Sequence, residues 1–332
     1  MVNHANERAK PHAHHDAQVE EPLTQADDGA ADDSDDSRSA TPKQDQSEDA
    51  DIDKAEPRKP ARRILEQEIA EGLGEIERPL PGLMLSGVSA GLDVGFSLLL
   101  MAVALSRFGD VLAEPFVDLI MANMYAIGFI FVIVGRSELF TEHTTLAILP
   151  VLNGRATVRG LMRLWTVIYG ANLLGVAIFA LLVTTVAPAL GVVKIEAFGT
   201  IAEHMTAHGW WVILLSGVLA GWMMGLLSWL VTAGRDTISQ VVLIWLVTAA
   251  IGFSGLHHSI VGSAEVLAGI FAGQGTTWLD FGHFLLWATL GNAIGGVFFV
   301  ALIKYSHVLY SSAQQQEVSL TGELRKRHSY NR

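Results

Sequence analysis

Two polar interruptions, each inside a segment apolar enough to cross a bilayer, constrain this sequence more than any other feature. The first, GRSELFTEHT, covers residues 135–144, and the second, GFSGLHHSIVGS, covers residues 252–263. Backbone N–H and C=O groups can leave a helix at membrane depth only where protein or a water-filled cavity satisfies them. Two such breaks in one chain therefore predict a pore or a substrate site between broken transmembrane helices.

Six segments are long and apolar enough to cross a bilayer, which takes about 20 consecutive apolar residues in a helix. The second and fifth segments contain the two interruptions. The six lie near residues 83–106, 115–152, 160–188, 209–233, 237–272 and 282–308. Only 17% of all residues are charged, against about 25% in an average soluble domain. We therefore expect an all-α integral membrane protein with a transmembrane domain at residues 80–310.

Both ends of the chain are polar. In residues 1–60, acidic side chains outnumber basic ones by 16 to 7, and few large apolar residues are present. Such a segment cannot bury enough surface to offset its ordering entropy, so we expect a disordered acidic tail. Residues 61–79 carry apolar side chains at helical spacing opposite a charged face, which predicts an amphipathic helix at the membrane interface. Residues 311–332 are expected to form a cytoplasmic tail.

The basic residues of the predicted loops are unevenly shared between the two sides of the membrane. One side, together with both tails, holds most of the arginines and lysines, whereas the loops of the opposite side offer only Arg107 and Lys194. Loops rich in arginine and lysine face the cytoplasm. We therefore expect an integral protein of the plasma (inner) membrane with both termini cytoplasmic.

The two halves of the hydrophobic region repeat one another. SGVSAG at residues 86–91 returns as SGVLAG at residues 216–221. Asn172 and Asn292 lie 120 residues apart in two similar small-residue segments, and we expect both to support the breaks. Because each half holds three spans, the second half must insert upside down. The predicted fold is thus a 3+3 inverted repeat of six transmembrane helices, with helices 2 and 5 broken.

The same offset relates the two breaks to each other. A shift of 120 residues places Gly135 over Gly255 and Glu138 over His258. Glu138 is expected to brace its loop, either by accepting backbone N–H bonds or by pairing with Arg136, rather than to touch a ligand.

The chemistry of the breaks favours a small anion. Thr141 and Ser259 stand where an N-cap would be, so two half-helix N-termini, each with a partial positive charge, are expected to point to a common centre. Phe140 supplies an apolar plug beside the Thr141 hydroxyl. His258 can donate a hydrogen bond or exchange a proton near neutral pH. The alternative is a buried neutral histidine bonded to a helix carbonyl.

Two carboxylic acids inside predicted spans remain open between two roles. Asp93 and Glu265 could relay protons or pair with Arg136 or His257, because ionisable groups at membrane depth are functional by default. They could equally cap helices or face a subunit interface. His257 is expected to face away from its neighbour His258 on any regular backbone.

GRSELFTEHT and LHHSIVGS together resemble the formate/nitrite transporter family, in particular its branch with a long N-terminal tail. The resemblance covers about residues 80–310. It implies an aquaporin-like protomer with its own pore, assembled as a homopentamer that passes small monovalent weak-acid anions or their conjugate acids. By motif, Leu139, Phe140 and Thr141 match the pore-lining loop of the second span, and His258 matches the central histidine of the family.

Three further residues fall near the apolar constrictions of that family: Tyr125, Phe129 and Ile251. The chain also departs from the family pattern. Where the family often has a lysine before its fourth span, this chain has Met205, with His204 and His208 close by. This difference bears on the identity of the anion and on the response to pH.

Several functions are compatible with the sequence. The first is a passive channel for small anions, with or without gating by pH. The second is a proton-coupled carrier of the same ligands with Asp93 or Glu265 in the relay, and the third is a non-transporting membrane scaffold that uses the acidic tail. An enzyme is not expected, because membrane metalloenzymes show several spaced histidine boxes and this chain has one adjacent pair. We expect no cofactor, no metal site and no nucleic-acid partner.

Overall fold

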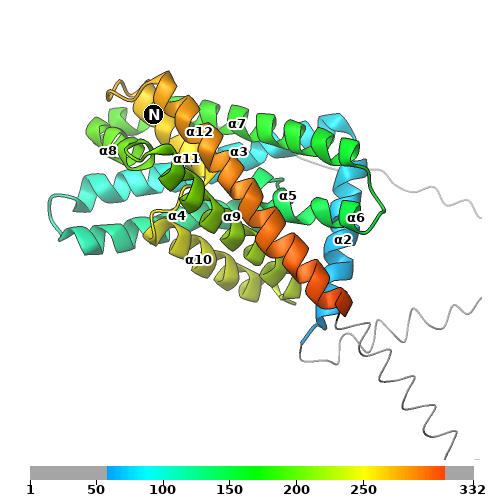
Figure 1. Cartoon of the computed structure of the whole chain (residues 1–332). Helices are drawn as coiled ribbons and strands as arrows, with labels where there is room; N and C mark the ends of the chain where they lie inside the picture. The colour runs from blue at the N-terminus through cyan, green and yellow to red at the C-terminus, as the bar shows by residue number, and fades with distance from the viewer. Residues whose placement is uncertain (1–57, 311–332) are drawn as a thin grey trace, which may run out of the picture. The chain divides into compact units, whose positions relative to one another are not determined.

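The computed structural model describes residues 58–310, and all regular structure in this range is helical (Figure 1). The C-terminal tail and all but the last three residues of the predicted acidic tail lie outside the described residues. The expected all-α fold is confirmed. Five helices are long and apolar enough to cross a membrane, and two shorter apolar helices share the remaining span.

Each half of the described chain consists of a long helix, a broken helix and a second long helix. In the first half these are α3 (Leu80–Phe108), the broken α4 (Glu114–Val134), α5 (Phe140–Leu146) and α6 (Ile148–Leu152), and α7 (Val158–Ala189). In the second half they are α9 (Trp210–Ala233), the broken α10 (Thr237–Phe253) and α11 (Ser259–Phe271), and α12 (Trp278–Ile294). The last helix continues through a π-helical stretch, η1 (Gly295–Leu302).

The contacts between helices follow this repeat. Helix α3 packs along α7 and α9 along α12, while α4 of one half packs against α10 of the other. Close approach is possible because small residues face each other. A Cβ atom on Gly91 would lie 2.8 Å from the Cα atom of Gly175. Small residues at such crossings allow van der Waals packing and carbonyl contacts between transmembrane helices.

One helix, α8 (Ile195–Thr206), was not predicted. It joins the two halves and packs against α11. Its polar residues and its length of 12 residues make it too short and too mixed to register as a span. Its apolar stripe is nevertheless buried, at Ala197, Phe198, Ile201, Ala202 and Met205. The segment between the third and fourth spans is therefore a packed helix rather than an irregular loop.

The helix predicted after the acidic tail is α2 (Ala61–Glu77), which lies beside α6 in Figure 1. Its apolar side chains Ile64, Leu65 and Ile69 are buried in a cluster with Leu149 and Trp229. A location at the membrane interface remains a prediction. The apolar stripe that suggested this location is covered by protein.

A candidate pore between the two helix breaks

The two breaks are the same turn built twice. Arg136 and Gly255 both have left-handed backbone, with φ of 60° and 61°. One residue later, the N–H of Ser137 bonds to the carbonyl of Val132, and the N–H of Leu256 bonds to the carbonyl of Ile251. Equivalent residues of the breaks therefore lie 119 positions apart.

This register corrects the expected one. At 119 residues, Arg136 rather than Gly135 corresponds to Gly255, and Leu139 rather than Glu138 corresponds to His258. Leu139 and His258 also share their backbone, with φ of −99° at both. The offset of 120 holds only beyond the breaks, where the N-caps Thr157 and Thr277 begin α7 and α12. The second half has one additional residue in the loop before α12. An offset of 120 residues, which is correct for α12, therefore does not apply to the breaks.

The half-helices also begin earlier than predicted. Leu139 and His258 are the N-caps of α5 and α11, so Ser259 is the first helical residue and Thr141 the second. Nδ1 of His258 accepts a hydrogen bond of 3.3 Å from the N–H of Val261. Hydroxyl caps are unnecessary here, because an asparagine from another helix satisfies the first N–H of each half-helix.

Asn172 on α7 holds the first break by three hydrogen bonds. Its Oδ1 accepts from the N–H of Phe140 at 2.8 Å. Its Nδ2 donates to the carbonyls of Glu138 at 2.9 Å and of Gly87 on α3 at 2.8 Å. The amide is fully buried, and both of its donor hydrogens are used. The unwound backbone is thereby satisfied without water, as membrane depth requires.

Asn292 on α12 repeats this arrangement at the second break. Its Oδ1 accepts from the N–H of Ser259 at 2.8 Å. Its Nδ2 donates to the carbonyls of His257 at 3.0 Å and of Gly217 on α9 at 2.9 Å. Asn172 and Asn292 were predicted to support the breaks, and the contacts show how they do so.

Two serines that were not singled out add a further contact to each break. The Ser86 hydroxyl accepts from the N–H of Glu138 at 3.3 Å, and the Ser216 hydroxyl accepts from the N–H of His257 at 3.0 Å. Both serines open the repeated SGV motif of α3 and α9. That repeat was the signal that could have identified them.

Thr141 and His258 meet where the two breaks face each other. The Thr141 hydroxyl oxygen lies 2.7 Å from Nε2 of His258, and both side chains are buried. Because Nδ1 of the imidazole accepts from a backbone N–H, a neutral ring carries its proton on Nε2 and donates it to Thr141. The threonine hydroxyl hydrogen is then free to bond to a ligand.

Two cavities border the breaks, and the larger one reaches His258. The larger, of about 650 Å³, is lined by α8, the start of α4 and the second break, and includes Tyr125, His258 and Glu265. The smaller, of about 430 Å³, is lined by α2, the end of α4 and the first break, and includes Ile133 and Ile244.

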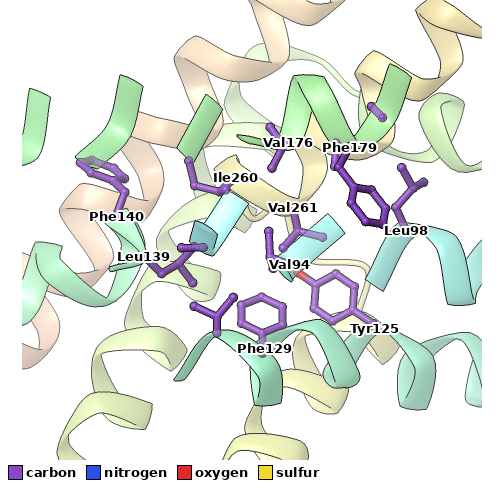
Figure 2. Close-up of a cluster of buried hydrophobic side chains, with 14 of the residues drawn as sticks. Val94, Leu98, Tyr125, Phe129, Leu139, Phe140, Val176, Phe179, Ile260 and Val261 are labelled. Atoms are coloured by element: carbon purple, nitrogen blue, oxygen red, sulfur yellow. The ribbon is translucent and has the colours of Figure 1, made fainter. Parts of the chain in front are cut away.

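Apolar side chains separate the two cavities. On α4, Tyr125 lines the larger cavity and Ile133 the smaller, so Phe129 lies one turn from each. On α10, Ile251 lies two turns after Ile244, which lines the smaller cavity, and directly before Gly252, which lines the larger. Phe129 and Ile251 are fully buried, and the Phe129 ring meets the His258 ring edge-on with centroids 5.2 Å apart. Figure 2 shows Phe129 and Tyr125 side by side on α4.

Leu139 and Phe140 take opposite sides of the first break. Leu139 is fully buried, and in Figure 2 it lies near Phe129. Phe140 packs instead on α7, with ring centroids 4.8 Å from Tyr169 and 6.2 Å from Trp165. Phe140 and Leu139 both lie outside the linings of the two cavities, and the role of Phe140 as an apolar plug stays a prediction.

The ion pairs beside the first break differ from the expected one. Glu138 pairs with Arg78, which follows α2, and not with Arg136. Arg136 lies 3.7 Å from Glu71 of α2 and is mostly exposed. Arg78 and Glu71 lie about 60 residues before the break in the sequence, and the packing of α2 brings them next to it.

The two intramembrane carboxylic acids occupy different environments. Asp93 accepts hydrogen bonds from Ser89 at 3.2 Å and Ser137 at 3.4 Å and lines neither cavity. Glu265 lines the larger cavity on the same side as His258. His257, expected to face away from His258, also lines this cavity. Glu265 is thus placed to exchange protons through the larger cavity, whereas Asp93 stabilises the first break.

Six spanning segments with two mirrored breaks, and a buried polar pair between opposed cavities, define a membrane channel or transporter. Residues 62–306 match the family model described as "Formate/nitrite transporter", and the chain belongs to this family. It is therefore an integral membrane protein of a transporter and channel family, and not one of an enzyme family.

The relatives agree with this assignment. The chain is 31% identical over 242 residues to "Inner membrane protein YfdC" of Escherichia coli (strain K12), covering 72% of this chain and 76% of that protein. It is 30% identical to "Probable formate transporter" of Methanothermobacter thermautotrophicus, covering 62% and 85%. A solved "FNT family ion channel" superposes with a TM-score of 0.66 at 26% identity, covering 74% and 99%. The fold also matches "Pentameric formate channel with formate bound", with a TM-score of 0.60 at 22% identity, covering 69% and 98%.

Proposed function

We propose that this protein is a channel for small monovalent weak-acid anions such as formate, nitrite or hydrosulfide. The observation that carries the proposal is the 2.7 Å contact between the Thr141 hydroxyl and His258, buried between two cavities. The pair offers hydrogen-bond donors to a passing ligand without placing a permanent charge there. A lysine or arginine at this place would hold an anion too tightly for passage.

The apolar side chains on either side of the pair favour the neutral acid. A bare anion between Phe129, Leu139 and Ile251 loses its hydration, whereas its conjugate acid loses far less. An approaching anion favours the cationic form of His258. The ring, now protonated on Nδ1 in place of its long bond from Val261, passes its Nε2 proton to the anion. The Nδ1–H tautomer that remains returns to the Nε2–H form by proton exchange with cavity water. The proton that recharges the ring comes from water in the larger cavity.

Assembly and orientation belong to the same proposal. We infer a homopentamer with one pore in each protomer, because the solved formate channel that shares this fold is pentameric. The distribution of lysine and arginine supports cytoplasmic termini in the plasma (inner) membrane, which places the smaller cavity, beside α2, toward the cytoplasm. The outer helix faces carry many exposed apolar side chains, suited to lipid and to neighbouring protomers.

A proton-coupled carrier is the second candidate, and one observation favours it. Glu265 is 3% exposed and lines the same cavity as His258, so a proton can pass between the two through cavity water. In the carrier each proton passes through Glu265, whereas in the channel it comes from cavity water, although both deliver a proton with the anion. Glu265→Gln therefore separates the two mechanisms, because formate uptake should stop in a carrier and continue in a channel.

The test is stopped-flow uptake by proteoliposomes of formate, nitrite and hydrosulfide, each against protein-free liposomes. We expect protein-dependent flux of at least one of them. His258→Phe should lower it by about tenfold or more, because a buried donor for the passing ligand is lost. His283→Phe, at a histidine outside both cavities, is the matched control. Unchanged flux in His258→Phe, with the oligomer intact by size-exclusion chromatography, would refute the proposed role.

A further inference from the structure

The larger cavity contains three imidazoles that the proposed permeation step does not use. His204 lies in the last turn of α8, His208 follows the end of that helix, and His257 comes from the second break. The ring centroids of His204 and His208 are 6.4 Å apart, and those of His208 and His257 are 5.5 Å apart. The three rings thus form a continuous cluster along the wall of the cavity.

Two buried polar atoms on this wall lack a hydrogen-bond partner among the described residues. Nδ1 of His257 lies 2.9 Å from the Ser216 hydroxyl. Its Nε2 makes no bond within normal limits of distance and angle, although the carbonyl of Met205 faces it. The hydroxyl of Tyr125 is likewise buried and unpartnered. Buried polar groups without a partner are rare, so these two, lining one cavity, point to a ligand.

The charge of the cavity depends on the cluster. The titratable groups that line it are Glu114, Asp118, Tyr125, His204, His208, His257, His258 and Glu265. With neutral imidazoles the charged members are carboxylates, which repel an anion. Added protons on His204 and His208 turn this repelling cavity into an attracting one.

Other charged groups near α8 do not line the cavity. They lie on α8 itself and on the helices that pack against it, α3 and α12, and they are Glu196, Glu203, Arg107, Asp280 and His283. The last three turns of α7, which also touches α8, contain no titratable residue. The histidine cluster is thus the source of positive charge within the described lining of this cavity.

We propose that His204, His208 and His257 form a second anion-binding subsite, which a small carboxylate or oxyanion occupies only when His204 and His208 are protonated, with the unpartnered Nε2 of His257 as a neutral donor. The anion held there is released toward Thr141 and His258. This inference rests on the proposed function, because the bound anion is the one that permeates. It adds a site that couples entry of the anion to the proton concentration on the side of the larger cavity.

The direct test requires no flux. Protein with ¹⁵N-labelled histidine in nanodiscs is titrated with sodium formate at pH 5.5 and at pH 8.0. Signals are assigned with His204→Gln, His208→Gln and His257→Gln. At pH 5.5 the three signals should move saturably, with an affinity about tenfold or more above that at pH 8.0. Absent or pH-independent movement would overturn the proposal.

A flux measurement separates this proposal from the proposed function. In proteoliposomes at pH 5.5, the double variant His204→Gln/His208→Gln should raise the apparent KM for formate about tenfold. Its maximal rate should remain close to that of the wild type, and His283→Gln should change neither. Formate passage without movement of the histidine signals refutes the subsite and leaves the channel. Movement of the signals without passage refutes the channel and leaves the subsite.

Discussion

Asn172 and Asn292, from two different helices, hold two broken helices by the same three hydrogen bonds. Each amide oxygen accepts the first N–H of a half-helix, at 2.8 Å in both cases. Each amide nitrogen donates to a carbonyl of the unwound turn and to a carbonyl of a neighbouring helix. The residues that carry the proposed chemistry are therefore positioned by groups that never touch a ligand.

Replacing Asn292 with alanine should destabilise the protein strongly. The change leaves the N–H of Ser259 and the carbonyl of His257 buried without the asparagine, and each such group costs about 1–3 kcal/mol. The carbonyl of Gly217, inside α9, loses only its bond from the asparagine. We expect a clear fall in the unfolding temperature of the detergent-solubilised protein. Asn123→Ala is the matched control, because Asn123 lies on the surface of α4 and bonds to Trp245 and to its own helix. Equal unfolding temperatures for the two variants would contradict the assigned role.

Thr141→Val should abolish most of the flux while preserving the fold. Valine has nearly the shape of threonine but lacks the hydroxyl, so the buried Nε2–H of His258 loses its acceptor and the ligand loses a donor. We expect a reduction of about tenfold or more in formate or nitrite uptake by proteoliposomes.

Thr141→Ser keeps the hydroxyl and should recover most of the flux. Thr185→Val is the control for the same substitution at a position away from the breaks. Thr185 is exposed on α7 and bonds only to its own helix in the described structure. If Thr141→Val and Thr185→Val carry the same flux as the wild type, the hydroxyl takes no part in permeation.

The sequence was sufficient to predict the spans, the two breaks and the meeting of Thr141 with His258. These follow from hydropathy and from the backbone groups that a break must satisfy at membrane depth. The predicted correspondence between the two breaks was wrong by one residue. Equivalent residues of the breaks lie 119 positions apart, but one extra residue in the loop before α12 makes the offset 120 in that helix.

The remaining differences arise from contacts between distant segments. Nothing in the local sequence around Glu138 indicates Arg78 rather than Arg136 as its partner, because the choice depends on how α2 packs. The predicted N-caps at Thr141 and Ser259 failed for a similar reason. Local capping rules assume that a helix end must satisfy itself, whereas here Asn172 and Asn292 satisfy it from other helices.

Arg136→Gly should stabilise the protein slightly. A non-glycine residue in left-handed backbone costs about 1 kcal/mol, and Arg136 has a φ of 60°. The contact with Glu71 that is lost is long and exposed, and such pairs contribute about 0–1 kcal/mol. We expect a small rise in unfolding temperature.

Gly255 provides the opposite test at the equivalent position. Alanine there adds a Cβ atom 2.8 Å from Nε2 of His204 and places it on backbone with a φ of 61°. Gly255→Ala should therefore lower the unfolding temperature. If both substitutions shift it in the same direction, the two turns do not share the conformation described.

Glu68 makes the docking of α2 sensitive to pH. Its side chain is fully buried and accepts hydrogen bonds from Ser228 at 2.9 Å and Thr232 at 3.2 Å. Burial raises the pKa of Glu68 from 4.5 to about 7, although these hydroxyls and the nearby Glu71 also act on it. A raised pKa in the folded state means that the stabilising contribution is complete below pH 4.5 and is lost as the pH rises through 7. Helix α2 should thus be held more firmly in acid.

Hydrogen exchange of the α2 amides measures this effect directly. In the wild type, protection should fall between pH 5 and pH 8 by an amount on the order of 3 kcal/mol at most, after correction for intrinsic exchange rates. Glu68→Gln stays neutral throughout and should retain its protection at pH 8. Glu66→Gln, at an exposed position paired with Arg62, should behave like the wild type. The same pH dependence in Glu68→Gln would show that another group controls the docking of α2.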